Sequence, residues 1–251
     1  MSASLKDIRA LIVDLDGVIT DTAQQHFRAW KRMFDAYLEE QGASDASDPF
    51  TEEDYREYVD GKPRIEGADS FLRSRDFVLE RGNPDDPADA ETLWGLGNRK
   101  NRFYREILED EGVQPFPDAM TLLRSARDAG LPCAMVSSSR NAGKVVEAAG
   151  IERFFLASVD GRDLADGDLA GKPAPDLFLE AARRLGVDAR DAAVLEDARS
   201  GVQAGRRGGF GKVVGVARHG EERALLDAGA DFVVSRLDEI DLPSPFNEAE
   251  Q

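Results

Sequence analysis

Asp14 and Asp16 are the residues near the start of the chain whose types and spacing are best suited to chemistry. One residue, Leu15, separates them. The pair directly follows the apolar run 10–13, and Gly17 comes after it. In an open parallel sheet the ligand crevice lies outside the carboxyl ends of the strands, so carboxylates at such an end indicate a reaction site. In isolation, the same spacing would more often mark an ordinary turn after a strand.

Three further polar clusters follow apolar stretches in the second half of the chain. Residues 137–141 read Ser-Ser-Ser-Arg-Asn, Lys172 precedes a proline-started helix, and Glu196 and Asp197 end an apolar run. Hydroxyl and backbone N–H groups at the start of a helix suit phosphate, although such residues are also ordinary helix caps. Adjacent carboxylates are costly to hold together without a cation, whereas a single loop lysine is often only a solvated side chain.

Together the four clusters supply the parts of a phosphoryl-transfer site. They offer an aspartate nucleophile, hard oxygen ligands for Mg²⁺, and a hydroxyl and a lysine for the phosphoryl oxygens. Phosphoryl transfer depends mainly on positioning and on neutralising the charge that spreads in the transition state. The sequence therefore predicts a magnesium-dependent phosphotransferase.

From residue 115 onward, the elements that must position these clusters alternate between short apolar strands and amphipathic helices. This alternation favours right-handed crossovers and a parallel sheet with helices on both faces. The predicted strands, the first of which precedes this stretch, are residues 10–13, 133–136, 154–156, 192–195, 213–216 and 232–234. The predicted helices are residues 119–129, 142–149, 177–185, 201–207 and 224–227.

Residues 23–113 differ from the rest because their apolar positions recur at helical spacing and no convincing strand interrupts them. We expect helices at 22–40, 51–59, 67–80 and 88–110, and a loop at 42–49. The predicted fold class is therefore α/β, with a Rossmann-like parallel-sheet core and an inserted α-helical cap domain. The core would be discontinuous, made of residues 1–22 and 114–251, and the cap would be residues 23–113.

The composition argues against several functional classes. The 251 residues carry 49 acidic and 32 basic side chains, and the net charge of −17 opposes binding to nucleic acid or anionic lipid. No apolar run approaches the ~20 residues that a membrane span needs. Cys133 is the single cysteine, so no internal disulfide can form. Because no apolar leader precedes the first strand, we expect a cytoplasmic protein.

The four clusters, in this order, resemble the haloacid dehalogenase superfamily. They match its motifs with Asp-Leu-Asp-Gly-Val at 14–18, Ser137 after the second core strand, Lys172 before a proline, and the Glu196-Asp197 pair. The similarity is strongest to the β-phosphoglucomutase branch, at residues 14–22, 26–31, 99–101 and 172–176. The resemblance covers most of residues 8–216 and is weakest in the cap.

The resemblance implies a role for each core residue. Asp14 would attack phosphorus and form an aspartyl-phosphate, and Asp16 would contact the substrate as general acid and base. Ser137 and Lys172 would bind the transferring phosphoryl group. Mg²⁺ would be held by Asp14, the backbone carbonyl of Asp16, Glu196 and Asp197.

The resemblance also implies a second phosphate site. Gly61, Lys62 and Arg64 align with the family's substrate loop in the cap, and Arg64 would grip the distal phosphate of a sugar bisphosphate. A planar guanidinium is suited to that task. The core side of the same site would be formed by Ser139, Arg140 and Asn141, where Arg140 replaces a lysine that is usual in the family.

Three residues of the cap or its junction receive further roles from the resemblance. Thr22 and His26 would couple closure of the cap to the position of Asp16, and Lys100 would contact substrate. The alternatives are that His26 is an ordinary half-buried histidine and that Lys100 is a solvated surface lysine.

The activity that the resemblance implies is interconversion of β-glucose 1-phosphate and glucose 6-phosphate through a bound 1,6-bisphosphate. A sugar-phosphate phosphatase would share the core residues and use water in place of a second sugar phosphate. A third alternative is a non-catalytic sugar-phosphate sensor, against which the retention of both Asp14 and Asp16 argues. The implied partner is a small phosphorylated sugar, with no nucleic acid or membrane, and the implied state is a monomer.

Overall fold

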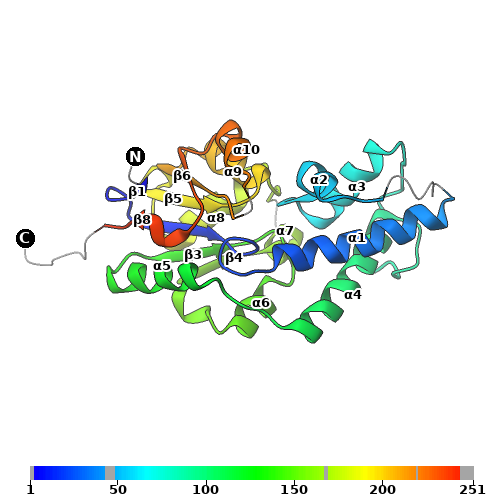
Figure 1. Ribbon diagram of the computed structural model, residues 1–251, viewed down its shortest axis with the longest axis horizontal. Coiled ribbons are helices and arrows are strands. Elements are labelled where there is room, and N and C mark those ends of the chain that lie inside the picture. Colours follow the sequence, from blue (N-terminus) through cyan, green and yellow to red (C-terminus); the bar gives the residue numbers. More distant parts are fainter. Residues whose placement is uncertain (1–2, 43–48, 167–168, 219, 244–251) are drawn as a thin grey trace, which may run out of the picture. The chain divides into compact units, whose positions relative to one another are not determined.

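The computed structural model describes residues 3–42, 49–166, 169–218 and 220–243 (Figure 1). The chain divides into two compact units, an α/β unit of Met1–Asp21 with Gln114–Gln251 and a helical unit of Thr22–Val113. The predicted boundary placed Thr22 in the α/β unit, whereas the structure groups it with the helical unit. Most of the loop predicted at 42–49 lies outside the described residues.

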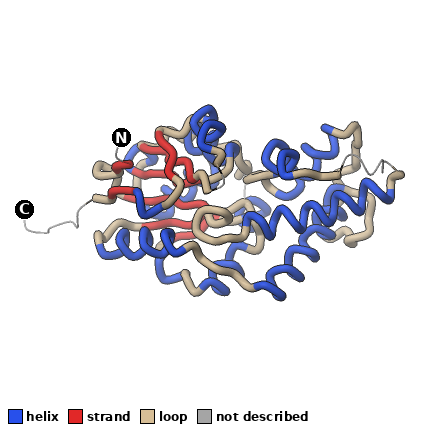
Figure 2. The backbone as a smooth tube through the Cα atoms, in the orientation of Figure 1, coloured by secondary structure: helices blue, strands red, loops and turns tan. Residues whose placement is uncertain are grey.

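A six-stranded parallel sheet forms the centre of the α/β unit (Figure 2). Its strand order is β4-β3-β2-β5-β6-β7, and every neighbouring pair is parallel. The predicted α/β class with a Rossmann-like parallel sheet is thereby confirmed. The strands are β2 (Ala10–Asp14), β3 (Cys133–Val136), β4 (Ala157–Val159), β5 (Ala192–Glu196), β6 (Lys212–Val216) and β7 (Phe232–Val234).

The middle of this sheet is a topological switch point. From β2 the strand order runs outward to β3 and β4 on one side and to β5, β6 and β7 on the other. Val13 of β2 is in register with Met135 of β3 and with Leu195 of β5. Open α/β sheets bind ligands outside the carboxyl ends of the strands at such a point, so the residues that end β2 and β5 are placed for chemistry.

All five residues of β2 and of β5 are buried, as expected for parallel strands that helices cover. The helix α8 (Asp176–Leu185) packs against β2, β3 and β4, and α9 (Arg199–Arg207) packs against β5 and β6. The other helices of the unit are α5 (Pro117–Asp128), α6 (Ala142–Ala149), α7 (Gly161–Asp166) and α10 (Glu222–Ala228). Short elements complete it: β1 (Ala3–Ser4), β8 (Ile240–Asp241), and the 3-10 turns η2 (Glu152–Phe154), η3 (Ala189–Asp191) and η4 (Leu237–Glu239).

The strand predicted at 154–156 is wrong. This stretch begins within the η2 turn, and β4 starts only at Ala157, in register with Ala134 of β3. Phe154 is buried, but Leu156 is 78% exposed, so the short apolar run is not a buried strand. Three consecutive apolar residues carry no periodicity that distinguishes a strand from a turn.

The helical unit contains α1 (Ala23–Glu40), α2 (Glu52–Asp54), the π-helical turn η1 (Tyr55–Val59), α3 (Arg64–Ser74) and α4 (Leu93–Glu111). The helix predicted at 67–80 begins earlier, at Arg64, and ends before Asp76, whose φ of 62° is left-handed. The helix predicted at 88–110 begins only at Leu93, because the Thr92 hydroxyl caps it by accepting from Gly95 N at 3.0 Å. Among the described residues, no helix has both the length and the apolar character needed to cross a bilayer.

Aromatic side chains form the core of the helical unit. The Phe34 ring centre lies 4.8 Å from that of Phe50 and 4.3 Å from that of Phe71. Trp30 stacks on Phe34 at 5.1 Å. Each such pair contributes about 0.5–1.5 kcal/mol beyond the burial of its area. The helical unit therefore has a hydrophobic core of its own.

Cys133 gives a prediction about the packing of β3. Its thiol is buried, and burial raises its pKa to about 12. Because the thiolate is the reactive form, we expect no reaction with a disulfide reagent at pH 8 until the protein unfolds. Stability should also fall as pH rises above the ordinary thiol pKa of about 8.5, since the unfolded chain then loses a proton that the folded chain keeps.

The measurement is the rate of thiol labelling with and without denaturant, with a free cysteine peptide as the control. Labelling of the native protein as fast as the peptide would contradict the burial of this thiol.

Candidate active site

Three charged side chains meet at the carboxyl ends of β2 and β5. The Lys172 ammonium donates to Oδ1 of Asp14, which ends β2, and to Oε1 of Glu196, which ends β5. Exposed fractions of these side chains are 1% for Lys172, 8% for Asp14 and 0% for Glu196. The sheet thus places residues from distant parts of the sequence around one buried cation.

Burial shapes the charge states of this group. It raises the pKa of Asp14 well above its usual range, an effect that the Lys172 charge opposes and that Glu196 and Asp16 reinforce. Burial alone would lower the pKa of Lys172, but the carboxylates of Asp14 and Glu196 outweigh it and raise that pKa. Lys172 therefore stays charged and favours the ionised form of Asp14.

The donor set is chemically suited to Mg²⁺. Two buried carboxyl groups share one lysine, so when both are ionised one negative charge is left over, whose burial is costly without a further cation. Carboxylate oxygens are the ligands that Mg²⁺ prefers.

Oε2 of Glu196 accepts from Ala198 N at 2.7 Å, so both oxygens of Glu196 already have partners. Within the described ranges, no three His, Cys, Asp or Glu side chains are grouped closely enough to form a metal centre by themselves.

Asp16 and Ser137 form a second contact at this edge of the sheet. The Ser137 hydroxyl donates to Oδ2 of Asp16 at 2.9 Å and accepts from Ser139 N at 3.0 Å. Ser137 is buried, while Asp16 is half-buried. Asp197 is also half-buried and directly follows β5. The structure therefore brings the predicted core residues to one edge.

The turn after Asp16 depends on Gly17. Its φ of 88° lies in the left-handed region that favours glycine. Gly17 N donates to Thr20 O at 2.9 Å, and Thr20 N donates to Leu15 O at 3.0 Å. These bonds close a tight turn that returns the chain towards the sheet, with the Asp16 side chain at its start.

The loop after β3 is packed tightly against the loop after β4. Gly161 has no side chain here because a Cβ atom would lie 2.6 Å from Ser138 O and 2.7 Å from Arg140 N. Arg140 is exposed, whereas Asn141 is buried and its N–H donates to the Ser139 hydroxyl at 3.2 Å. Ser139, Arg140 and Asn141 thus share a loop of defined shape at the start of α6.

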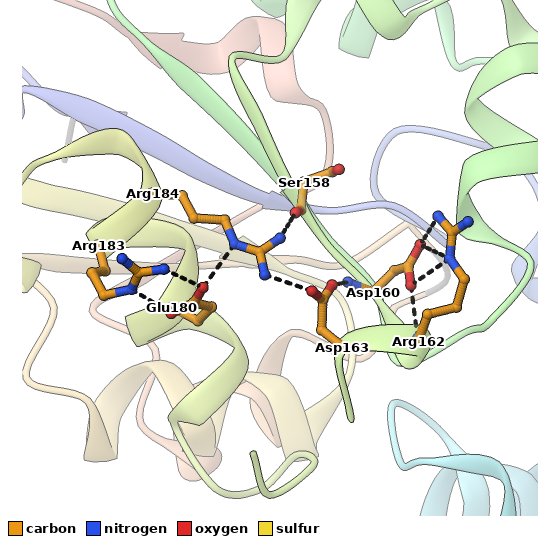
Figure 3. Close-up of polar contacts among 7 residues, drawn as sticks. All are labelled: Ser158, Asp160, Arg162, Asp163, Glu180, Arg183 and Arg184. Atoms are coloured by element: carbon orange, nitrogen blue, oxygen red, sulfur yellow. Dashed lines mark hydrogen bonds and ion pairs between the residues drawn. The ribbon is translucent and has the colours of Figure 1, made fainter. Parts of the chain in front are cut away.

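A network of arginines and carboxylates joins residues 158–163 to helix α8 (Figure 3). Arg184 of α8 donates to the Ser158 carbonyl, to Asp163 of α7, and to Glu180 at 2.8 Å. These bonds tie both ends of the β4–α7 segment to α8. The same helix, α8, directly follows the loop that carries Lys172.

In the helical unit, the predicted residues His26 and Lys100 lie together. The Lys100 Nζ is 2.7 Å from Nδ1 of His26, whose ring stacks on Tyr104 at 3.9 Å. Lys100 is only 4% exposed, so the alternative of a solvated lysine is wrong. Thr22 is also buried, and its carbonyl accepts from His26 N at 2.9 Å.

Arg64 lies at the start of α3, against α4. Its guanidinium contacts Gly97 O and Oδ1 of Asn98 and Asn101 at 3.4 Å each. Gly97 permits this approach, because a Cβ atom there would lie 2.9 Å from Cδ of Arg64. These contacts place the Arg64 side chain against α4.

The other two residues predicted in the substrate loop precede Arg64. Gly61 has a φ of 70°, in the left-handed region. Lys62 donates to the Ser70 hydroxyl at 3.0 Å, and burial lowers the pKa of its ammonium. The loop therefore presents Lys62 and Arg64 from one rigid turn.

Gly201 is a site residue that the sequence reasoning missed. A Cβ atom at this position of α9 would lie 1.7 Å from Oε1 of Glu196, so Glu196 reaches Lys172 only because residue 201 is glycine. The signal in the sequence was a glycine-bearing helix directly after the Glu196-Asp197 pair. The sequence alone does not show that this glycine matters, because its role depends on how closely α9 approaches the end of β5.

The geometry agrees with comparisons to known proteins. The sequence pattern of haloacid dehalogenase-like hydrolases matches residues 8–209, and the chain therefore belongs to the haloacid dehalogenase-like hydrolase family. It is 49% identical over 241 residues to the β-phosphoglucomutase of Mycobacterium bovis, an alignment that covers 93% of this chain and 91% of the relative. The β-phosphoglucomutase of Bacillus subtilis is 35% identical, with 97% and 96% covered. The crystal structure of a Clostridium difficile β-phosphoglucomutase superposes with a TM-score of 0.71 at 25% identity, with 92% of each chain covered.

We predict that Gly201→Ala severs the contact between Glu196 and Lys172. The added methyl group overlaps Oε1 of Glu196, and overpacking of this kind costs about 1–3 kcal/mol of unfolding free energy. Because Lys172 would lose one of its two carboxylates, the turnover number should fall by about 10²-fold, as when one preorganised electrostatic contact is removed.

The measurements are urea unfolding and turnover of a phosphate ester. Gly67→Ala, in helix α3, is the matched control because its nearest contact is Val59 Cγ1 at 3.3 Å. Equal effects of the two substitutions would show that Gly201 has no special relation to the site.

Proposed function

We propose that the protein is a β-phosphoglucomutase that interconverts β-glucose 1-phosphate and glucose 6-phosphate. The observation that carries this proposal is the buried Lys172 between Asp14 and Glu196, beside the contact between Asp16 and Ser137. The similarity to β-phosphoglucomutases over more than nine-tenths of the chain supports it.

Asp14 is the nucleophile in this proposal. One of its carboxylate oxygens attacks phosphorus, so an aspartyl-phosphate bond forms as the bond from phosphorus to the sugar oxygen breaks. Lys172 places a fixed positive charge beside this carboxylate and the phosphoryl oxygens. Ser137 lies within hydrogen-bonding distance of Asp16 and offers a hydroxyl to the same phosphoryl group.

Asp16 is the general acid and base. It gives a proton to the sugar oxygen that leaves, and it takes a proton from the hydroxyl that attacks the aspartyl-phosphate in the second half of the reaction. Because both steps use the same residue, the distance between Asp16 and the reacting oxygen must be closely controlled. Its hydrogen bond from Ser137 contributes to that control.

Mg²⁺ would be held by Asp14, the backbone carbonyl of Asp16, Glu196 and Asp197. When bound, it neutralises charge on the phosphoryl group and on the nucleophilic carboxylate. The surplus negative charge of the two buried carboxylates over Lys172 supports this assignment.

A mutase must also bind a second phosphate, which a simple phosphatase does not need. We assign this task to Arg64 with Lys62 in the helical unit and to Ser139, Arg140 and Asn141 in the α/β unit. Thr22 and His26 would couple closure of the cap to the position of Asp16. Lys100, whose Nζ contacts Nδ1 of His26, would contact the substrate. Sugar-phosphate hydrolysis is the second candidate, because the family that the chain matches is one of hydrolases.

We further propose that the enzyme acts in the cytoplasm, as a monomer, on a small phosphorylated sugar. The net charge of −17 supports a partner that is neither nucleic acid nor an anionic membrane surface. The single, buried Cys133 is in keeping with a reducing compartment.

The test of the proposed function is incubation with Mg²⁺, β-glucose 1-phosphate and a trace of the 1,6-bisphosphate. We expect glucose 6-phosphate without an equivalent amount of free phosphate, and loss of both the product and the phosphoenzyme in Asp14→Ala. Free phosphate without glucose 6-phosphate would establish the phosphatase instead. Full activity of Asp14→Ala would exclude this residue as the nucleophile.

We predict that Arg64→Ala impairs the mutase reaction far more than the hydrolysis of p-nitrophenyl phosphate. A charge-assisted contact to phosphate contributes about 1.5–3 kcal/mol, which is roughly 10- to 150-fold in the mutase kcat/KM. The small ester has no second phosphate and should be nearly unaffected.

Arg73→Ala is the matched control, because Arg73 lies on the same helix, is exposed, and pairs with Asp69. Equal losses with the two substrates in Arg64→Ala would assign this arginine a structural role.

A further inference from the structure

Arg218, which follows β6, binds the turn that carries Asp16. Its Nε donates to Gly17 O at 3.0 Å, and its Nη2 donates to Val18 O at 2.7 Å. These two carbonyls belong to the residues directly after Asp16. One guanidinium therefore holds the backbone of the turn from which the Asp16 side chain projects.

The same guanidinium is fixed from its other side. Nη1 donates to both carboxylate oxygens of Asp118, at 3.0 and 3.3 Å. Asp118 also accepts from Leu237 N at 2.7 Å, and the guanidinium carbon lies 3.7 Å from the centre of the Phe116 ring. Arg218 is 10% exposed and Asp118 is 4% exposed. The guanidinium is thus held by two carbonyls, a carboxylate and an aromatic ring.

The turn is also the point at which both connecting segments are joined within the α/β unit. Thr20 pairs with Pro115, Asp21 N donates to Gln114 O at 3.0 Å, and Phe116 N donates to Ile19 O at 2.9 Å. The chain thus leaves this unit and returns to it beside the guanidinium of Arg218.

A contribution to folding stability does not by itself explain why Arg218 and Asp118 are buried together. A buried ion pair is costly to desolvate and often contributes little to folding. The planar fork of an arginine does, however, fix several acceptors at once in one geometry, which a lysine cannot do. The contacts of Arg218 therefore fit a requirement for precise placement of the turn.

We propose that Arg218 is the residue that positions Asp16 for general acid–base catalysis. The proposal rests on the acid and base role of Asp16 in the proposed function, and it applies to a mutase and to a phosphatase alike. Arg218 acts through the backbone at Gly17 and Val18 and does not touch the substrate. Its loss would move the Asp16 carboxyl while leaving Lys172, Asp14 and Glu196 joined.

This role predicts a dependence on the leaving group. A sugar oxygen must be protonated as it departs, whereas p-nitrophenolate departs without a proton. We expect Arg218→Gln to slow transfer from the sugar phosphate to Asp14 by about 10²-fold, the usual cost of displacing a catalytic group by about 1 Å. Transfer from p-nitrophenyl phosphate should slow by less than about 5-fold, because it makes little use of general acid catalysis. Asp16→Asn should show the same selectivity more strongly.

The measurement is the rate at which the first equivalent of each leaving group is released, followed in rapid mixing with Mg²⁺. This first turnover reports only phosphorylation of Asp14. Arg75→Gln is the matched control, because Arg75 also binds a carboxylate, that of Asp54, and lies 5.3 Å from the centre of the Phe71 ring in the other unit. It should lose stability in urea without changing the ratio of the two rates.

Arg218→Lys provides a second variant if Arg218→Gln does not fold. It keeps the charge, but one ammonium cannot reach Gly17, Val18 and Asp118 together, so the same selectivity is expected. Equal losses with both donors, or a loss of stability without a change in either rate, would overturn the proposal. A wild-type enzyme that transfers phosphate without isomerising its sugar would refute the mutase and leave this comparison intact.

Discussion

Lys172 donates to Asp14 and to Glu196, so one buried ammonium joins the ends of two neighbouring strands. Neither carboxylate is stable at this burial without a cation, and the ammonium is equally costly alone. The three groups therefore depend on one another, and the sheet register that aligns β2 with β5 is what allows them to meet. The charge that remains after this pairing is the physical reason to expect a divalent cation and a phosphoryl group here.

Two glycines of the α/β unit allow close packing because they have no side chain. At Gly201 and Gly161, a Cβ atom would overlap Glu196 and the loop after β3. Without a side chain at these two positions, the Glu196 carboxylate can approach α9 and the loop after β3 can approach Gly161. The positive φ of Gly17 serves a related purpose, because it starts the turn that Arg218 then holds.

The helical unit contributes polar groups from within an aromatic core. Lys100 is buried beside His26 and 4.6 Å from the centre of the Tyr104 ring, so its charge is stabilised by an imidazole nitrogen and by π-electrons. Arg64 contacts Gly97 O and Oδ1 of Asn101 on α4 at 3.4 Å. The two cations differ in burial, since Lys100 is buried and Arg64 is half-buried.

The sequence by itself determined the class of the fold and the family, and it singled out core residues that the structure brings to one edge of the sheet. It could do so because the clusters at Asp14, Ser137 and Glu196 come at or directly after the ends of apolar runs, and parallel strands bring their carboxyl ends to one edge. It failed where local pattern carries too little information, as in the run 154–156, where the true strand begins at Ala157. It also missed Gly201 and Arg218, because their importance lies in contacts with residues far away along the chain, such as Val18. Only the tertiary structure decided those contacts, since close approach and hydrogen-bond geometry are set by how helices and strands pack and not by residue type.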